Sequence, residues 1–151
     1  LLMHKVLNGW NISRSGARVE SIFQSVIESI EKKETKDDER IFYWKMDQLP
    51  EKYNYYRVED AEGNKRAMDD VPSHEIINAI IEVLEEQISI GDKTLVREVA
   101  KKFGYSRLGN VIESSITFAI EYGINTEMLF KMENGNLKLN ENKVASKFSN
   151  D

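Results

Sequence analysis

The side chains best suited to chemistry in this sequence are the cations of residues 93–107. This segment carries five Lys or Arg residues against one carboxylate, a net charge of +4 in a protein of net charge −5. Residues 1–18 are also basic, with three cations and no carboxylate. Cations that contact phosphates release bound counterions, which drives non-specific binding to DNA and RNA. The pattern therefore favours nucleic-acid binding, and ordinary solubilising charge is the alternative.

We expect the phosphate contacts to lie at the starts of two predicted helices, along a basic helix and on a β-hairpin. Ser13 and Ser106 are predicted N-caps, which would place Arg14 and Arg107 at the first helical positions, where free N–H groups attract phosphate. Glu113 and its neighbours repel phosphate, so we expect weak, largely non-specific binding to DNA or RNA. The candidate residues are Arg14, Arg18, Lys93, Arg97, Lys101, Lys102, Ser106, Arg107, Asn110, Lys131 and Lys138.

A catalytic or metal-binding constellation is not visible in the sequence. His4 and His74 lie 70 residues apart, and the absence of cysteine excludes thiolate nucleophiles, disulfides and cysteine-based zinc sites. The acidic runs at 37–39 and 69–70 are predicted to be solvated loop charge. The sequence has no phosphate-binding glycine loop and no nucleophile elbow. We therefore expect a protein that is not an enzyme and that uses no cofactor or metal.

The elements that must position the basic residues are clearest between residues 73 and 140. Ser73 is a predicted N-cap, and apolar residues then recur with a helical period. Asn134-Gly135 between two short apolar segments predicts a β-hairpin. Three helices are predicted before it, over about 73–88, 93–103 and 106–123. This order predicts a winged helix-turn-helix unit.

The N-terminal part repeats half of this pattern. Residues 11–21 align with residues 104–114 at a constant offset of 93, so we expect residues 13–32 to be a second copy of the third helix. Residues 40–46 would be a wing strand, and the first helix of this copy would be missing. Gly16 and Gly109 would admit a close backbone approach or a tight helix crossing.

We therefore predict an α+β, mostly helical fold with tandem winged helix-turn-helix units, the first incomplete. The predicted divisions are a partial unit (1–47), a connector (48–72), a complete unit (73–140) and a polar C-terminal tail (141–151). The connector should contain a short aromatic strand and a Gly63-Asn64 turn. Most aromatic residues of the N-terminal half should fill the core between these parts, with stacking on unpaired bases as the alternative. Because a helix would be missing, something should cover Val6, Val19, Phe23 and Ile27.

The length of 151 residues fits one domain or two small ones, and 40% of the residues are apolar, near the globular norm. The sequence has no apolar run of 18 residues, so we expect no membrane span. The run of residues at the start of the sequence is too short for a signal peptide. The lack of cysteine suits a cytoplasmic location. The sequence begins with Leu1 rather than Met, which indicates a piece of a longer protein.

Several short motifs resemble a family of uncharacterised domains at the C-terminal end of bacterial superfamily I helicase-related proteins. The motifs are residues 9–19, Tyr56-Arg57, Arg66, residues 70–80 and residues 103–109, and the resemblance covers roughly residues 1–140. It implies a helicase-associated accessory module, with an upstream motor in the same chain as a partner. The motor's own nucleotide-binding loop is absent from this sequence.

The leading expectation is thus a non-catalytic nucleic-acid-binding accessory module. The alternative is a protein–protein interaction module that docks a partner or the protein's own motor, and a structural spacer is the third hypothesis. Phosphate binding weakens steeply with salt, whereas apolar docking hardly responds, so a salt titration separates the first two.

Overall fold

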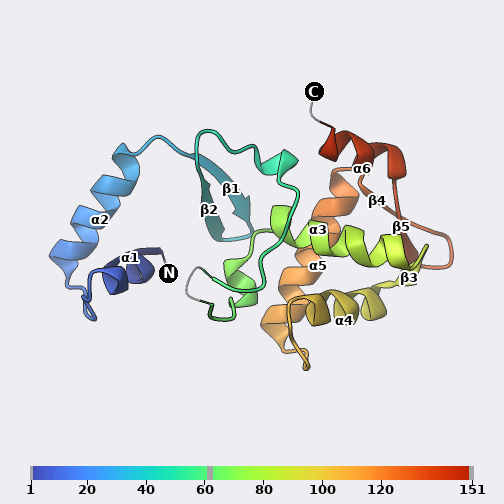
Figure 1. Ribbon diagram of the computed structural model, residues 1–151, viewed down its shortest axis with the longest axis horizontal. Coiled ribbons are helices and arrows are strands. Elements are labelled where there is room, and N and C mark those ends of the chain that lie inside the picture. The colour runs from blue at the N-terminus through green and yellow to red at the C-terminus, as the bar shows by residue number, and fades with distance from the viewer. Residues whose placement is uncertain (1, 61–62, 150–151) are drawn as a thin grey trace. The chain divides into compact units, whose positions relative to one another are not determined.

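The computed structural model describes residues 2–60 and 63–149, in which contacts divide the chain into two units, residues 1–33 and 34–151 (Figure 1). The described residues are mostly helical with small β-sheets, which confirms the predicted α+β class. The division lies between Lys33 and Glu34, whereas the first unit was predicted to end at residue 47. The difference arises because the residues after Lys33 have their contacts within the second unit.

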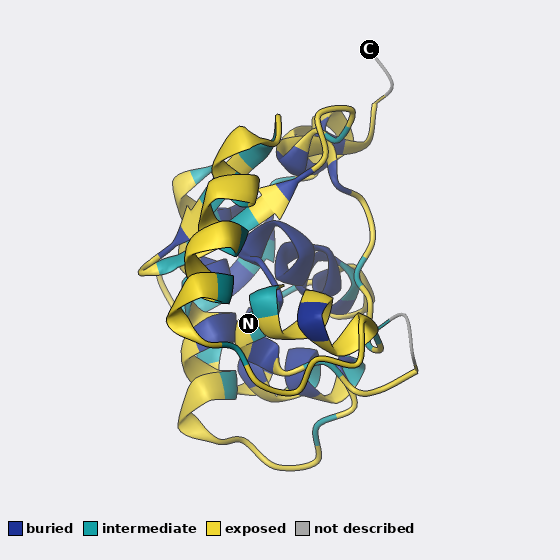
Figure 2. Ribbon diagram, turned by 90° about the vertical axis from the view of Figure 1, so that its left-hand side faces the viewer, coloured by how far each residue is buried: buried dark blue, intermediate teal, exposed yellow. Residues whose placement is uncertain are grey.

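The first unit consists of two short helices, α1 (Leu2–Gly9) and α2 (Ala17–Ser29). Leu7 is the one buried residue in the described part of this unit, and α2 buries none. The α1 helix, which begins near the N label in Figure 2, is exposed along most of its length. Although both helices are amphipathic, the described part of the unit has almost no core of its own.

The second unit begins with a two-stranded sheet, β1 (Lys33–Asp37) and β2 (Arg40–Trp44), so the strand predicted within residues 40–46 is present. Two single-turn 3₁₀ helices follow, η1 (Pro50–Lys52) and η2 (Met68–Asp70). The aromatic strand predicted in the connector is absent from the described residues. The Asn78 side chain instead donates hydrogen bonds to the carbonyls of Tyr53 and Tyr55, at 3.0 and 2.9 Å, which satisfies backbone groups that a neighbouring strand would otherwise pair.

In the rest of the second unit, the three helices and the hairpin follow the order predicted from the sequence, whereas β3 and α6 were not predicted. The elements are α3 (Ser73–Glu86), β3 (Ile90–Gly91), α4 (Asp92–Lys102), α5 (Asn110–Asn125), β4 (Leu129–Lys131), β5 (Asn136–Leu139) and α6 (Glu141–Phe148). The last three strands form an antiparallel sheet in the order β3-β5-β4, with Ile90 opposite Leu137. Gly135 has a φ of +83° in the β4–β5 turn, a conformation that glycine adopts without strain.

The core of this unit lies between α3, α4, α5 and the three-stranded sheet. Ile77 and Ile80 of α3, Leu95 of α4 and Ile116 of α5 are all fully buried. A Cβ atom at Gly123 would lie 2.7 Å from the side chains of Ile77 and Leu129. Gly123 is therefore the site of close packing between α5 and its neighbours. The predicted sites of close approach, Gly16 and Gly109, have no atom within 4 Å of such a Cβ.

The helix starts differ from the prediction at three N-caps. The N-cap of α3 is Pro72 rather than Ser73, and the caps of α2 and α5 are Gly16 and Gly109 rather than Ser13 and Ser106. Ser73 donates instead to the buried Asp37 carboxylate, from its backbone N–H at 2.6 Å and its hydroxyl at 2.8 Å. Asp37 was predicted to be a solvated loop charge. Its burial is stabilised because the N-terminus of α3 supplies both hydrogen bonds and a favourable dipole.

The expected polar tail at 141–151 is helical over α6. Asn140 caps this helix by accepting a hydrogen bond from the Lys143 backbone N–H, and Val144 and Lys147 face inward and are buried. Lys147 donates to the Glu51 carbonyl at 2.9 Å, while Lys52 donates to the Ser146 carbonyl at 2.9 Å. These reciprocal bonds fasten α6 to η1.

Candidate nucleic-acid interface

The predicted cations of α4 form a row on the exposed side of this helix. Lys93, Arg97 and Lys101 are exposed and spaced four residues apart, which places them on one face. The opposite face, with Leu95 and Val99 at its centre, is buried against α3 and α5. The burial of that apolar face thus fixes the orientation of the basic row.

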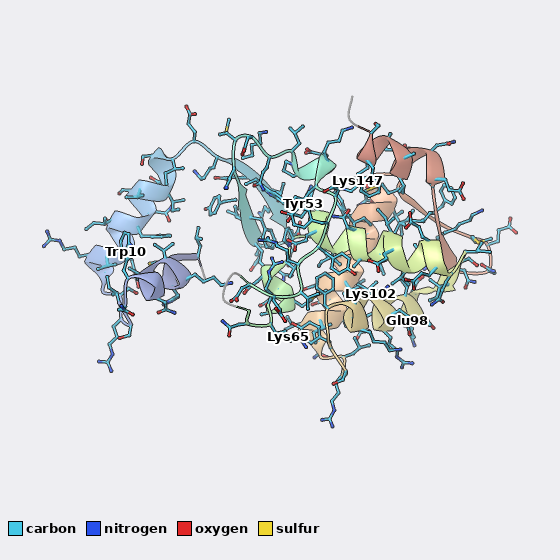
Figure 3. The ribbon with its side chains drawn as sticks, viewed as in Figure 1. Trp10, Tyr53, Lys65, Glu98, Lys102 and Lys147 are labelled. Carbon is cyan, nitrogen blue, oxygen red and sulfur yellow. The ribbon has the colours of Figure 1, made fainter. Side chains whose placement is uncertain are left out.

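Several of the candidate cations are paired with carboxylates. Lys102 bridges Glu82 at 2.7 Å and Glu86 at 2.8 Å, and these bonds raise its pKa. Lys101 lies 2.7 Å from Glu98, which Figure 3 labels together with Lys102. Exposed pairs of this kind stabilise a fold by at most about 1 kcal/mol, but they compete with phosphate for the cation.

Other candidates differ in how accessible they are. Lys131 on β4 pairs with Asp92 at 2.6 Å. Lys93, Arg97 and Arg107 make no ion pair within residues 2–60 and 63–149. Arg107 and Ser106 are exposed in the turn before α5, because the helix begins later than predicted. Lys93, Arg97 and Arg107 are therefore the candidates of the second unit most available to a phosphate.

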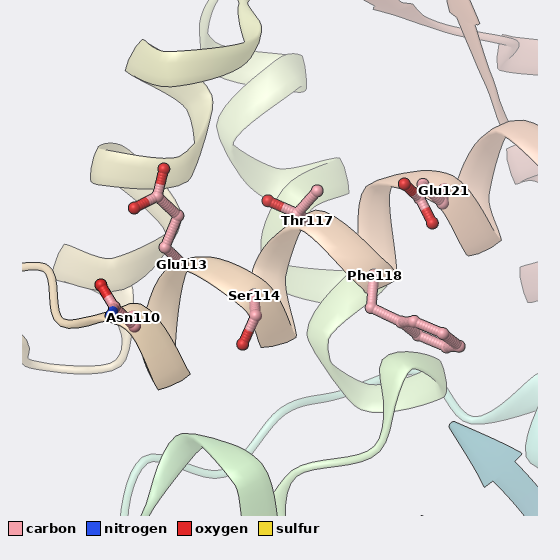
Figure 4. Close-up of a pocket in the computed structure, with 6 residues that line it drawn as sticks. All are labelled: Asn110, Glu113, Ser114, Thr117, Phe118 and Glu121. Atoms are coloured by element: carbon pink, nitrogen blue, oxygen red, sulfur yellow. The ribbon is translucent and has the colours of Figure 1, made fainter. Parts of the chain in front are cut away.

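The outer face of α5 is polar and acidic rather than basic. Its residues line a surface hollow in Figure 4: Asn110, Glu113, Ser114, Thr117, Phe118 and Glu121. The α5 sequence contains two carboxylates and no cation. Because phosphate is repelled by both carboxylates, α5 is poorly suited to enter a groove of DNA.

The remaining candidates belong to other elements than α4. Arg14 and Arg18 are exposed in the first unit, Arg14 in the irregular segment before α2 rather than at its first helical position, because α2 begins at Ala17. Lys138 is half-buried on β5, where its side chain lines a surface cavity with Leu139.

A buried ion cluster joins residues that sequence reasoning did not connect. Glu75 is fully buried, and its carboxylate accepts the Arg57 backbone N–H at 2.7 Å and pairs with the Arg57 and Arg66 guanidiniums. The Tyr105 hydroxyl donates to the Arg66 carbonyl at 2.7 Å. The cluster fixes the connector to α3 and to the turn before α5, since each buried charge has a partner. The only sequence signal was that both arginines stand in the motifs that resemble the helicase-associated family.

His74 is buried among aromatic rings. Its ring centroid lies 4.5 Å from that of Tyr122 and 5.9 Å from that of Trp44. Burial lowers the pKa of His74, so the imidazole is neutral at pH 7, and its Nδ1 atom has no hydrogen-bond partner among the described residues. The described residues contain no group of three potential metal ligands.

The aromatic residues of the N-terminal half divide between core and surface. Trp44 and Tyr53 are buried and pack edge to face at 5.2 Å, as expected for core residues. Trp10, labelled in Figure 3, is 72% exposed and does not fill a core. Val6 is likewise exposed, while Val19, Phe23 and Ile27 are half-buried.

Comparisons with protein-family models, curated proteins and solved structures find no match for this chain. None of the described helices is long and apolar enough to cross a membrane.

Proposed function

We propose that residues 73–140 form a winged helix-turn-helix unit that binds the phosphate backbone of DNA or RNA through α4. The element order α3-β3-α4-α5-β4-β5 and the strand order β3-β5-β4 support this arrangement. The observation that carries the function is the exposed row of Lys93, Arg97 and Lys101 on a helix whose opposite face is packed in the core.

In this proposal α4 lies along the backbone while α5 stays outside the groove. Glu113 and Glu121 on α5 repel phosphate, so base edges are not read and binding is largely independent of sequence. We expect a dissociation constant of about 10⁻⁴–10⁻⁶ M at physiological salt, the range of non-specific binders. Such a module would hold nucleic acid near a catalytic partner, which agrees with an accessory role in a helicase-related protein.

The experiment compares two triple variants with equal loss of charge. Lys93→Gln, Arg97→Gln and Lys101→Gln together remove the row on α4. The control replaces Lys36, Lys45 and Lys143, which are exposed on other elements of the second unit. Fluorescence anisotropy measures binding to single-stranded and double-stranded oligonucleotides between 50 and 300 mM salt.

We expect the α4 variant to flatten the salt slope on duplex DNA by up to about 2.7 units, since each phosphate contact contributes ~0.9. The control should keep the parental slope. Equal losses in both variants would mean that only net charge matters and would refute the proposed interface.

A second candidate function is docking to a protein, and the first unit favours it. Trp10, Ile22, Val26 and Ile30 are between 47% and 72% exposed, and exposed apolar side chains that form a patch mark sites of protein interaction. If neither oligonucleotide binds at 50 mM salt, the docking function becomes the better proposal.

A further inference from the structure

A pocket of about 340 Å³ lies beside α3 and is built from three separate segments of the second unit. The connector contributes Tyr55 and Tyr56, and α6 contributes Phe148. The α3 helix contributes Asn78, Glu82 and Glu85. The pocket therefore combines aromatic rings with carboxylates, and no cationic side chain lines it.

One hydrogen-bond acceptor of this pocket lacks a donor. Asn78 is 7% exposed, and its Nδ2 atom donates to three backbone carbonyls, which fixes the orientation of the amide. The Oδ1 atom is buried and has no partner among the described residues. A buried acceptor without a donor is costly, so a ligand that supplies an N–H group is favoured at this position.

The carboxylates of Glu82 and Glu85 differ in their hydrogen bonds and ion pairs. Glu82 accepts the Tyr56 hydroxyl at 2.7 Å and pairs with Lys102, and these bonds lower its pKa, so it is ionised at neutral pH. Glu85 is exposed and makes no ion pair within the described residues. The Glu85 carboxylate is therefore available to a cationic ligand.

We propose that this pocket binds an alkylammonium group, either a lysine side chain of a peptide or a free polyamine. Ring faces attract ammonium ions, Glu85 supplies the counter-charge, and Ile81 contacts the aliphatic arm. The Asn78 Oδ1 atom is the unsatisfied acceptor for one N–H of the ammonium group. This site is separate from the basic row of α4 and does not depend on the proposed nucleic-acid binding.

The test titrates ¹⁵N-labelled 151-residue protein with spermidine and with N-acetyl-lysine methylamide at 0.15 M salt. The corresponding norleucine derivative serves as the uncharged control. We expect saturable chemical-shift changes around Tyr55, Tyr56 and Phe148, with a dissociation constant on the order of 1 mM for ligands of this size. Saturation by only one amine identifies the source of the ammonium group, and both results support the site.

Two single variants and a matched control locate the binding. Glu85→Gln and Phe148→Leu should each weaken binding at least about threefold, as expected for the loss of a charge partner or a cation–π contact. Glu113→Gln changes the net charge equally but lies on α5, and it should leave the affinity unchanged. Absence of saturation with both amines, equal binding of the norleucine derivative, or equal weakening by Glu113→Gln would overturn the proposal.

Discussion

The helix pairs α1–α2 and α4–α5 share a local pattern but differ in packing. Both pairs keep the 93-residue offset: α1 and α4 end at Gly9 and Lys102, and α2 and α5 begin at Ala17 and Asn110. The N-cap glycines have similar dihedral angles, φ −98° and ψ 167° for Gly16 against φ −106° and ψ 164° for Gly109. Yet α5 buries five residues and α2 buries none.

Local sequence determines where these helices begin and end, whereas their burial depends on a third helix. The α4–α5 pair packs on α3, in which every residue from Ser73 to Ile81 is buried. The described part of the first unit contains no equivalent of α3. The similar helix ends alone therefore do not support a second winged unit, and our functional proposal is confined to residues 73–140.

The greatest change in stability should come from truncating one isoleucine in each of the two units. Ile80→Ala on α3 removes a fully buried side chain and should lower the free energy of unfolding by about 2–5 kcal/mol. Ile22→Ala on α2 truncates a side chain that is 55% exposed and should change it by less than about 0.5 kcal/mol. Urea unfolding, followed by the fluorescence of buried Trp44 in a Trp10→Phe background, measures the second unit.

Unfolding of the first unit should be followed separately by the fluorescence of Trp10 in a Trp44→Phe background. A large loss of stability in Ile22→Ala by either probe would mean that α2 is packed against a partner in solution. That result would remove the contrast between the two units.

A smaller change in stability should distinguish the start of α3, which has a side-chain partner, from the start of α2, which has none. Asp37→Ala removes the carboxylate that caps α3 and leaves the Ser73 N–H without its partner, which should cost about 1–3 kcal/mol. Ser13→Ala, at the predicted cap of α2, should cost close to nothing because the cap is Gly16 and makes no side-chain hydrogen bond. Thermal unfolding by circular dichroism measures both, and equal shifts in the midpoint would contradict the assigned caps.

The sequence predicted the features that depend on neighbouring residues. The apolar periods of α3, α4 and α5 and the Asn134-Gly135 turn are local signals, and these helices and the β4–β5 hairpin are confirmed. The predicted cap at Ser73 was wrong because the partner of Ser73 is Asp37, 36 residues away, and no local pattern indicates that they meet. The α6 helix was missed because its burial depends on η1, and the contacts between the two join residues 94 and 96 positions apart.

The candidate site likewise contains one feature that depends on local sequence and one that depends on distant residues. The four-residue spacing of Lys93, Arg97 and Lys101 is visible in the sequence, and in the structure these side chains form an exposed row. The pairing of Lys102 with Glu82 and Glu86 could not be predicted, because it joins α4 to α3 across about 20 residues. Net charge over a segment therefore overstates the number of cations available to phosphate.

The stability of the second unit should also depend weakly on pH, because Lys147 is buried in this unit and is only 6% exposed. Burial, helped by the nearby charge of Lys52, lowers the pKa of Lys147 to about 8 from 10.5. Between these values the unfolded chain binds more protons than the folded chain, so the stability contributed by this residue rises with pH above 8. The gain from pH 8 to 9.5 should be roughly 1.5 kcal/mol.

Lys147→Met should remove this gain, whereas Lys143→Met, at an exposed position of the same helix, should keep it. Urea unfolding of both variants and the parent at pH 8.0 and 9.5 measures the difference, and the comparison cancels the titration of other groups. Because a charged lysine is costly to bury, Lys147→Met should also be at least as stable as the parent at pH 7. If the parent and Lys147→Met respond equally to pH, then Lys147 is solvated in the folded protein and α6 is not fastened to η1 as described.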